Sequence, residues 1–227
     1  LTIFKRFHFE LYKVKKKLIK HLAKIFWEDN KDNLYYGHYY ILKNYTKKKL
    51  PYKINGEIQH GWNPSNGIPG HISSHNTESK KKRYYLWNDS NLNKALSDGF
   101  QNILPIGAPF IYLFDNYNPK KIVFPNSLIL FPLHSVEGEE YFDIIKSYRK
   151  YLNQIKNISN NFQKISVSLY WNDYENKEIL NLFSECNINV YCMGHREKEP
   201  NFLKNFIDIV GNYEYVSSDT YSSAIFY

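Results

Sequence analysis

One segment with the residues for acid–base chemistry is Gln59-His60-Gly61, at the end of a short run from Tyr52. Glycine lets the backbone turn tightly, so an imidazole beside it can be presented to a substrate as a general base. A histidine that follows a strand is also a common structural residue, held by its own hydrogen bonds. His60 is therefore a candidate base, with Gln59 and Gly61 as candidate contacts of the same site.

Two further segments have the residues for phosphate binding. Gly194-His195-Arg196 places an imidazole and a guanidinium directly after the apolar run 188–193. The hydroxyl-rich run 217–223 then follows another apolar run. Hydroxyl side chains cap helix N-termini, and the N–H groups of the same helix start bind phosphate, so both roles stay open for this run. Its candidate serines are Ser217, Ser218, Ser222 and Ser223.

Weaker candidates lie between these segments. His134 and Glu137 follow the apolar run 128–131, and we expect them at the same edge as the phosphate-binding residues. Asp173 and Glu175 come nearest to an acidic metal-binding pair, but their context is typical of a strand-to-helix turn with N-capping. We predict no metal and no cofactor.

The elements that must position these residues alternate between strands and helices. Such alternation predicts parallel β-α-β units with helices packed on the sheet faces, and ligands that collect at the carboxyl ends of the strands. The expected strands cover 84–87, 103–106, 128–131, 165–170, 188–193 and 213–217. The expected helices cover 4–26, 33–46, 91–99, 140–157, 175–185 and 201–210.

Turn-forming residues cluster between Asp115 and Pro125, where we place a domain boundary. The predicted organisation is a basic helical segment over 1–50, an acceptor-side lobe over 51–120 and a nucleotide-side lobe over 121–227. The chain begins at Leu1 and ends at Tyr227 within an apolar stretch, so we expect a fragment whose second lobe is truncated. Whether such a fragment is active or inactive is left open by the sequence.

The formal charge of +8 is confined to one end of the chain. Residues 1–50 hold 13 Lys and Arg against 4 Asp and Glu, whereas residues 51–227 hold 17 against 18. A nucleic-acid groove needs basic residues spread over a folded face, so we predict no nucleic-acid partner. Helix 4–26 is expected to be amphipathic. Its lysines form either a solvated face or, across residues 1–30, a contact with an anionic membrane surface.

The amino-acid composition indicates the structural class of the protein and its cellular compartment. A hydrophobic fraction of 43% and a charged fraction of 23% are typical of a globular protein and exclude general disorder. The two cysteines give no disulfide framework, which favours the cytoplasm. No apolar run approaches the ~20 residues of a membrane-spanning helix, so we expect a cytoplasmic protein with peripheral attachment at the inner membrane face as an option.

The order of the segments resembles the two-domain GT-B transferases that build bacterial surface polysaccharides. It is most similar to CDP-glycerol glycerophosphotransferases and to CMP-sugar transferases of the sialyl type. The resemblance rests on short motifs in order over residues 52–227: His60-Gly61-Trp62, Gly107-Ala108-Pro109, the run Leu128–Pro132, Gly194-His195-Arg196 and Asp219–Ser223. Trp62 and Arg196 stand where the teichoic-acid polymerase pattern has Thr and Pro, and Thr220 interrupts the last motif.

The resemblance implies two Rossmann-like parallel-sheet domains that face a cleft, and capsule or lipopolysaccharide glycosyl transfer from a CMP- or CDP-linked donor. His60 would be the catalytic base, His195 and Arg196 would hold the donor phosphate together with the serines named above, and Gly107 would line the cleft. The acceptor would be a glycan or a lipid-linked glycan. A CDP-polyol phosphotransferase of teichoic-acid type and a non-catalytic domain that binds glycan or scaffolds an assembly are the alternatives.

Overall fold

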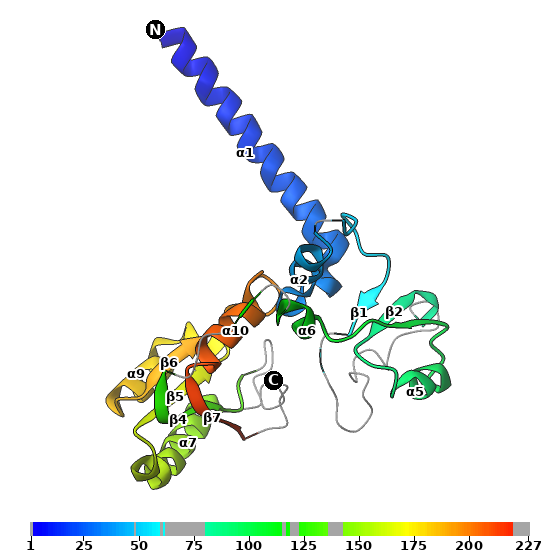
Figure 1. Ribbon diagram of the computed structural model, residues 1–227. Helices are drawn as coiled ribbons and strands as arrows, with labels where there is room; N and C mark the ends of the chain where they lie inside the picture. Colours follow the sequence, from blue (N-terminus) through cyan, green and yellow to red (C-terminus); the bar gives the residue numbers. More distant parts are fainter. Residues whose placement is uncertain are drawn as a thin grey trace.

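The computed structural model describes residues 2–47, 49–59, 61, 80–114, 117–118, 123–135 and 143–219, with side chains from residue 15 onward (Figure 1). The chain is an α/β protein with two sheets, and every strand pairing within them is parallel, as the alternation predicts. The first sheet has the order β1 (Glu57–Ile58), β2 (Arg83–Leu86), β3 (Asn102–Pro105). The second has the order β6 (Asn189–Cys192), β5 (Lys164–Leu169), β4 (Phe124–Phe131), β7 (Tyr213–Ser218).

Helices connect the strands, and those at 92–97, 144–158, 177–185 and 202–210 lie where the sequence predicts them, whereas the helices at 109–114 and 171–174 are not predicted. The α-helices are α1 (Thr2–Asn30), α2 (His38–Tyr45), α5 (Leu92–Ser97), α6 (Pro109–Phe114), α7 (Ile144–Ile158), α8 (Trp171–Tyr174), α9 (Lys177–Glu185) and α10 (Phe202–Val210). Short 3₁₀ turns, η1 (Lys31–Asn33), η2 (Tyr35–Gly37) and η3 (Ser159–Asn161), supplement them. Within the short run from Tyr52 that precedes His60, the strand β1 covers two residues.

A single helix over residues 33–46 is the wrong prediction. Tyr36 has a φ of 55° and Gly37 a φ of 79°, both in the left-handed region, so the helix is interrupted and α2 begins only at His38. The Tyr36 N–H donates to the Arg196 carbonyl at 2.6 Å. A long-range contact therefore replaces a helical hydrogen bond, which local periodicity does not reveal.

The first sheet is covered on both faces by elements close to it in sequence. α5 packs against β2 through Tyr84, Leu86, Ala95 and Phe100. A second cluster joins Leu34 and Tyr39 from the N-terminal segment to Ile54 and Ile58 at β1, and Phe26 at the end of α1 packs against it. Residues between Phe26 and Leu50 are thus part of the core that supports this sheet.

The second sheet also has helices on both faces. α7 and α9 pack against β4 and β5 in the largest cluster: Leu128, Leu130, Tyr148, Leu152, Ile155, Val167, Leu169, Ile179, Leu182 and Phe183. A smaller cluster forms around Met193, Phe206 and Ile207 of the β6–α10 region, and Phe110 and Leu113 of α6 pack onto it. Helix α6, which follows the first sheet, therefore contacts the second.

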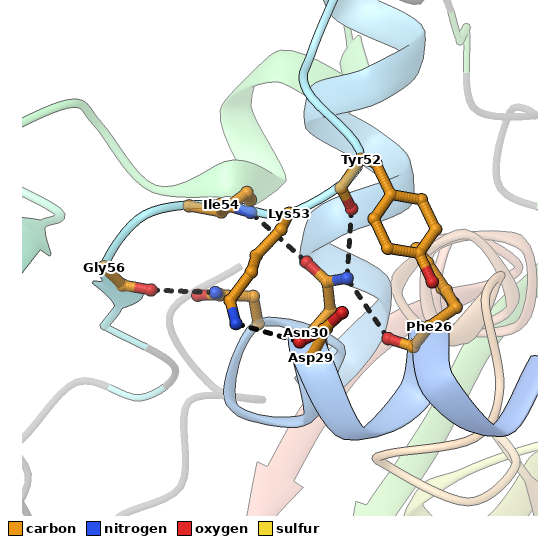
Figure 2. Close-up of polar contacts among 8 residues, drawn as sticks. Phe26, Asp29, Asn30, Tyr52, Lys53, Ile54 and Gly56 are labelled. Carbon is orange, nitrogen blue, oxygen red and sulfur yellow. Dashed lines mark hydrogen bonds and ion pairs between the residues drawn. The ribbon is translucent and has the colours of Figure 1, made fainter.

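Two asparagines at the end of α1 fix the segment that leads into β1. The Asn30 amide nitrogen donates to the carbonyls of Phe26 and Tyr52 at 3.1 and 3.0 Å, while its oxygen accepts the Ile54 N–H (Figure 2). Asn33 repeats the pattern three residues later, with Gly56 O and Ile58 N as its partners. Because both asparagines are buried, these bonds determine where β1 starts.

Replacing Asn30 with alanine is expected to lower the free energy of unfolding by about 2–4 kcal/mol. The change leaves the Tyr52 carbonyl and the Ile54 N–H without their side-chain partner at a position only 1% exposed. Urea unfolding measures the difference, and the same change at exposed Asn44 is the matched control. Equal stability of the two variants would show that Asn30 does not hold this segment.

Candidate functional site

Gln59 closes the carboxyl end of the first sheet. Its side chain is fully buried, with the amide nitrogen donating to Gly61 O at 2.8 Å and the oxygen accepting the Trp87 N–H at 3.0 Å. The Trp87 indole N–H also donates to the Gln59 carbonyl. Gln59 therefore ties the end of β1 to the end of β2. His60 itself lies outside the described residues.

Glu57, two residues before Gln59, lies in an environment that disfavours its charge. Burial, followed by the nearby Asp32 carboxylate, raises the pKa of Glu57 from 4.5 to about 7, against a smaller opposite effect of Lys82. In the unfolded chain the carboxyl ionises first, so the folded state binds more protons between these two pH values. Stability from this group is complete below pH ~4.5 and is lost as pH rises through about 7.

The variant Glu57→Gln removes this titration. We expect its free energy of unfolding to rise relative to the parent chain as pH increases from ~4.5 to ~7, and the difference to stay constant at higher pH. Urea unfolding at closely spaced pH values measures this. Parallel stability curves for the two chains would contradict the raised pKa, and Glu185→Gln, at an exposed position, controls for the loss of a charge.

The second sheet has the strand order of a Rossmann-like unit. From β4 the chain adds β5 and then β6 on one side, and it returns to place β7 on the other side of β4. The order reverses between β4 and β7, and parallel sheets bind ligands at the carboxyl ends beside such a reversal. His134 and Ser135 follow β4 there, and Ser218 ends β7.

Aromatic and basic side chains form a column along this carboxyl edge, which we call the edge column: Tyr35, Arg196, Tyr170 and His134. The Arg196 guanidinium lies over the Tyr35 ring at 5.7 Å and over the Tyr170 ring at 5.6 Å. His134 stacks on Tyr170 with ring centroids 4.3 Å apart. Segments after β4, β5 and β6 thus meet a residue from the N-terminal segment.

His195 belongs to a second stack beside the edge column. Its ring lies 4.5 Å from that of Trp171 at an interplanar angle of 23°. The His195 Nδ1 accepts the Glu197 N–H at 3.1 Å, and its carbonyl accepts the N–H of Glu199. The imidazole therefore both stacks and shapes the loop that carries Arg196.

Tyr35 is held in place by the same loop. Burial, then a hydrogen bond to Glu197, raises the pKa of Tyr35 to about 12, so its hydroxyl stays protonated at neutral pH. Next to it, Tyr36 packs against Phe202 with ring centroids 5.1 Å apart. The ring centroids of His38 and Trp87 lie 6.1 Å apart. Residues 35–38 therefore connect the carboxyl ends of the two sheets.

Asp173 is a buried hydrogen-bond acceptor for residues at the carboxyl edge of the second sheet. It is 2% exposed, and one carboxylate oxygen accepts both the Tyr148 hydroxyl at 2.7 Å and the Ser135 N–H at 3.0 Å. Asn172 donates to the Ser135 hydroxyl at 3.0 Å. Residues 171–176, where the sequence predicts a strand-to-helix turn, contain helix α8. Asn176 caps α9 by accepting the Glu178 N–H. Asp173 thus fixes the residues that follow β4.

Ser217 and Ser218 lie at the other end of this edge. Ser218 donates from its hydroxyl to the Phe131 carbonyl at 2.8 Å, and Ser217 is exposed. β5 and β4 lie between β6 and β7 in the sheet. Three strand spacings of ~4.8 Å therefore separate the two serines on β7 from the end of β6, where the His195–Arg196 loop begins, by about 14 Å. The structure joins His134, His195 and Arg196 into one region and places the two serines beyond β4.

The remaining predicted residues are either turn residues or lie outside the described part. Gly107 follows β3 with a φ of 86°, which allows the turn into α6. Gly61 is described, and a Cβ added to it would meet no atom of the described residues within 4 Å. Ser222, Ser223 and Glu137 lie outside the described residues, as does His60.

Sequence patterns did not single out Tyr35 or Tyr170, the hydroxyl contact of Tyr148, or the buried role of Asp173. The tyrosines are 21 of 227 residues, so their type alone marks no position. A signal existed for Tyr170 and Trp171, because both follow an apolar strand at the carboxyl end where ligands collect. Tyr35 carried none, since its contact with Arg196 joins positions 161 residues apart.

Within the described ranges, no group of three or more His, Cys, Asp or Glu side chains is arranged to hold a metal ion. In the same part of the chain, no helix combines the length and the apolar character that crossing a membrane requires. A comparison of the chain with protein-family models, with curated proteins and with solved structures finds no match.

Proposed function

We propose that this chain is a transferase of GT-B type that binds a nucleotide-activated donor at the carboxyl edge of the second sheet. The observation that supports this most is the edge column, in which Arg196 lies between two tyrosine rings beside the strand-order reversal. Two parallel sheets, each covered by helices, and a segment that connects their carboxyl ends agree with this architecture.

The chemistry of the edge suits a nucleotide diphosphate. Arginine binds phosphate oxygens through directed N–H groups, and stacking between tyrosines keeps its plane in a fixed orientation. His195 and His134 add imidazoles on either side of Tyr170 and Trp171, and rings of this kind also stack on bases. As the donor bond breaks, negative charge grows on the leaving phosphate, and cations fixed beside it stabilise the transition state.

The proposed donor is CMP- or CDP-linked, and the acceptor is a glycan or a lipid-linked glycan. In this proposal His60 removes the proton of the acceptor hydroxyl, while Gln59 sets the direction of the chain at that point by joining β1 to β2. Ser217 and Ser218, at the far end of the edge, would contact the part of the donor that extends past β4.

Binding of free nucleotides tests the proposal. We expect CMP or CDP to raise the melting temperature and to bind measurably in calorimetry, with UDP and GDP weaker. Arg196→Met keeps the apolar stem within the column but removes the guanidinium, and it is expected to weaken binding about tenfold or more. Arg149→Met, on the exposed face of α7, is the matched control.

The outcomes separate the alternatives. If no nucleotide stabilises the protein, the nucleotide-donor proposal fails and a non-catalytic glycan-binding domain replaces it. If CDP binds but only CDP-polyols are turned over, the protein is the polyol phosphotransferase. His60→Ala should retain nucleotide binding and lose transfer, and unchanged transfer in this variant would exclude His60 as the base.

A further inference from the structure

The exposed part of α1 presents an apolar surface that no described element covers. Residues 15–25 are all exposed, and the Leu18 and Leu22 side chains are 55% and 54% accessible. The helix extends away from both sheets (Figure 1). Among its described side chains, from residue 15 onward, Phe26 is the first that packs against other elements. Large aliphatic side chains exposed in a row on a helix mark an interaction surface.

Most charged side chains of this part lie away from its apolar arc, with Lys15 and Lys17 on the flanks of that arc. At 3.6 residues per turn, Leu18, Leu22 and Ile25 fall within about 60° of the helix circumference. The lysines Lys16, Lys20 and Lys24 fall on the opposite arc. The sequence spacing of Phe4, Phe7, Leu11 and Val14 continues the same apolar arc toward the N-terminus. A helix of 29 residues is about 43 Å long, so this arc forms an extended stripe.

The charges decide which kind of partner fits the stripe. Residues 15–25 hold five lysines and no acidic residue. A second copy of α1 packed on the stripe would cover the leucines, but within residues 15–25 it would offer no carboxylate to the lysines. The helix does not have the apolar character to span a bilayer. An anionic lipid surface satisfies both requirements, since acyl chains accept the stripe and headgroups attract the lysines.

We propose that α1 lies in the headgroup layer of an anionic membrane and holds the two-sheet body at that surface. The apolar stripe, with Leu18, Leu22 and Ile25, faces the acyl chains. Asn30 and Asn33 fix the end of α1 to β1, so the attachment is transmitted to the folded body through hydrogen bonds (Figure 2). This inference does not depend on the chemistry proposed for the edge column.

Co-sedimentation of the full chain with vesicles tests the inference. We expect binding to vesicles of phosphatidylglycerol mixed with phosphatidylcholine, and little binding to phosphatidylcholine alone. Two double variants separate the two contributions. Leu18→Gln with Leu22→Gln keeps the charge and the helix propensity and should abolish binding. Lys20→Gln with Lys24→Gln should weaken it about tenfold or more. Lys150→Gln with Lys156→Gln removes the same charge from exposed α7 and should bind like the parent chain.

Three results of these experiments would contradict membrane binding through α1. Unchanged binding of the Leu18/Leu22 variant would overturn the inference, because attraction would then be electrostatic alone. Failure of the parent chain to bind either kind of vesicle would also overturn it. Sedimentation velocity adds an independent result: a dimer that becomes a monomer in the Leu18/Leu22 variant would show that a second copy covers the stripe. Since the substituted side chains are exposed, an unchanged urea transition confirms that each variant is folded.

Discussion

Replacing Gly37 with alanine is expected to lower the free energy of unfolding by about 2–4 kcal/mol. Gly37 has a φ of 79°, where an L side chain adds about 1 kcal/mol of strain. A Cβ at this position would also lie inside van der Waals contact of the Pro200 carbonyl oxygen and 3.0 Å from the carbonyl carbon. Because these are backbone atoms, the 194–202 loop would have to move, at a further cost of about 1–3 kcal/mol.

Gly99 provides the matched control. It also has a left-handed φ, 91°, but the nearest atom to an added Cβ is the flexible end of Lys80 at 3.7 Å. Its role is to end α5, where the N–H groups of Gly99 and Phe100 donate to Leu96 O and Ala95 O. Gly99→Ala is therefore expected to cost only about 1 kcal/mol. Equal losses for the two variants in urea unfolding would show that Gly37 does not touch the loop.

Under the proposed function, the Gly37→Ala variant should also bind nucleotide more weakly. Gly37 packs against the loop that carries His195 and Arg196, next to the hydrogen bond from Tyr36 N to Arg196 O. Nucleotide affinity should fall in the Gly37→Ala variant and stay unchanged in Gly99→Ala. Calorimetry with CDP at a temperature where both variants are folded measures this difference, and equal affinities would separate the loop from the binding site.

Replacing Asp173 with alanine is expected to cost about 3 kcal/mol or more. The change removes the acceptor of the Tyr148 hydroxyl in the largest core cluster and of the Ser135 N–H at the carboxyl edge. A buried hydroxyl left without an acceptor costs about 1–3 kcal/mol, and the lost packing adds to it. Burial, then the hydrogen bond to Asp173, raises the pKa of Tyr148, so the hydroxyl remains a donor at any physiological pH.

A double-mutant cycle isolates the contact. Tyr148→Phe alone removes one donor and leaves Asp173 its bond to Ser135 N, so a smaller loss of about 1–2 kcal/mol is expected. If the two groups interact as the 2.7 Å distance indicates, the double variant will be less destabilised than the sum of the single ones. Asp89→Ala and Tyr174→Phe, both at exposed positions, are the controls. Strict additivity would contradict the interaction.

Both predictions concern the support of one region. Gly37 packs against the backbone of the β6–α10 loop at Pro200, and Asp173 accepts the N–H of Ser135 after β4. Neither side chain belongs to the edge column, yet each fixes one of its members. The charged column of Arg196 and its tyrosines thus depends on a glycine and a buried carboxylate for its geometry.

Local sequence patterns predict several regular elements of this chain, among them α7 and β5. In α7, apolar residues at three- and four-residue spacing, including Tyr148, Leu152 and Ile155, bury one face, and the helix has the expected position. β5 shows an equally local pattern, with a continuous apolar and small-residue run that is buried from Ser166 to Leu169. Periodicity predicts these elements because it reflects only the contact of each residue with a core on one side.

Tertiary structure alone decided which candidate residues meet. His195 and Ser218 both follow strands, but the order β6-β5-β4-β7 puts them at opposite edges of one sheet. Tyr35 joins Arg196 only because Tyr36 and Gly37 leave the helical conformation, against the local pattern of residues 33–46. Strand order and a broken helix depend on contacts between positions far apart in the chain, and no pattern within a short window contains that information.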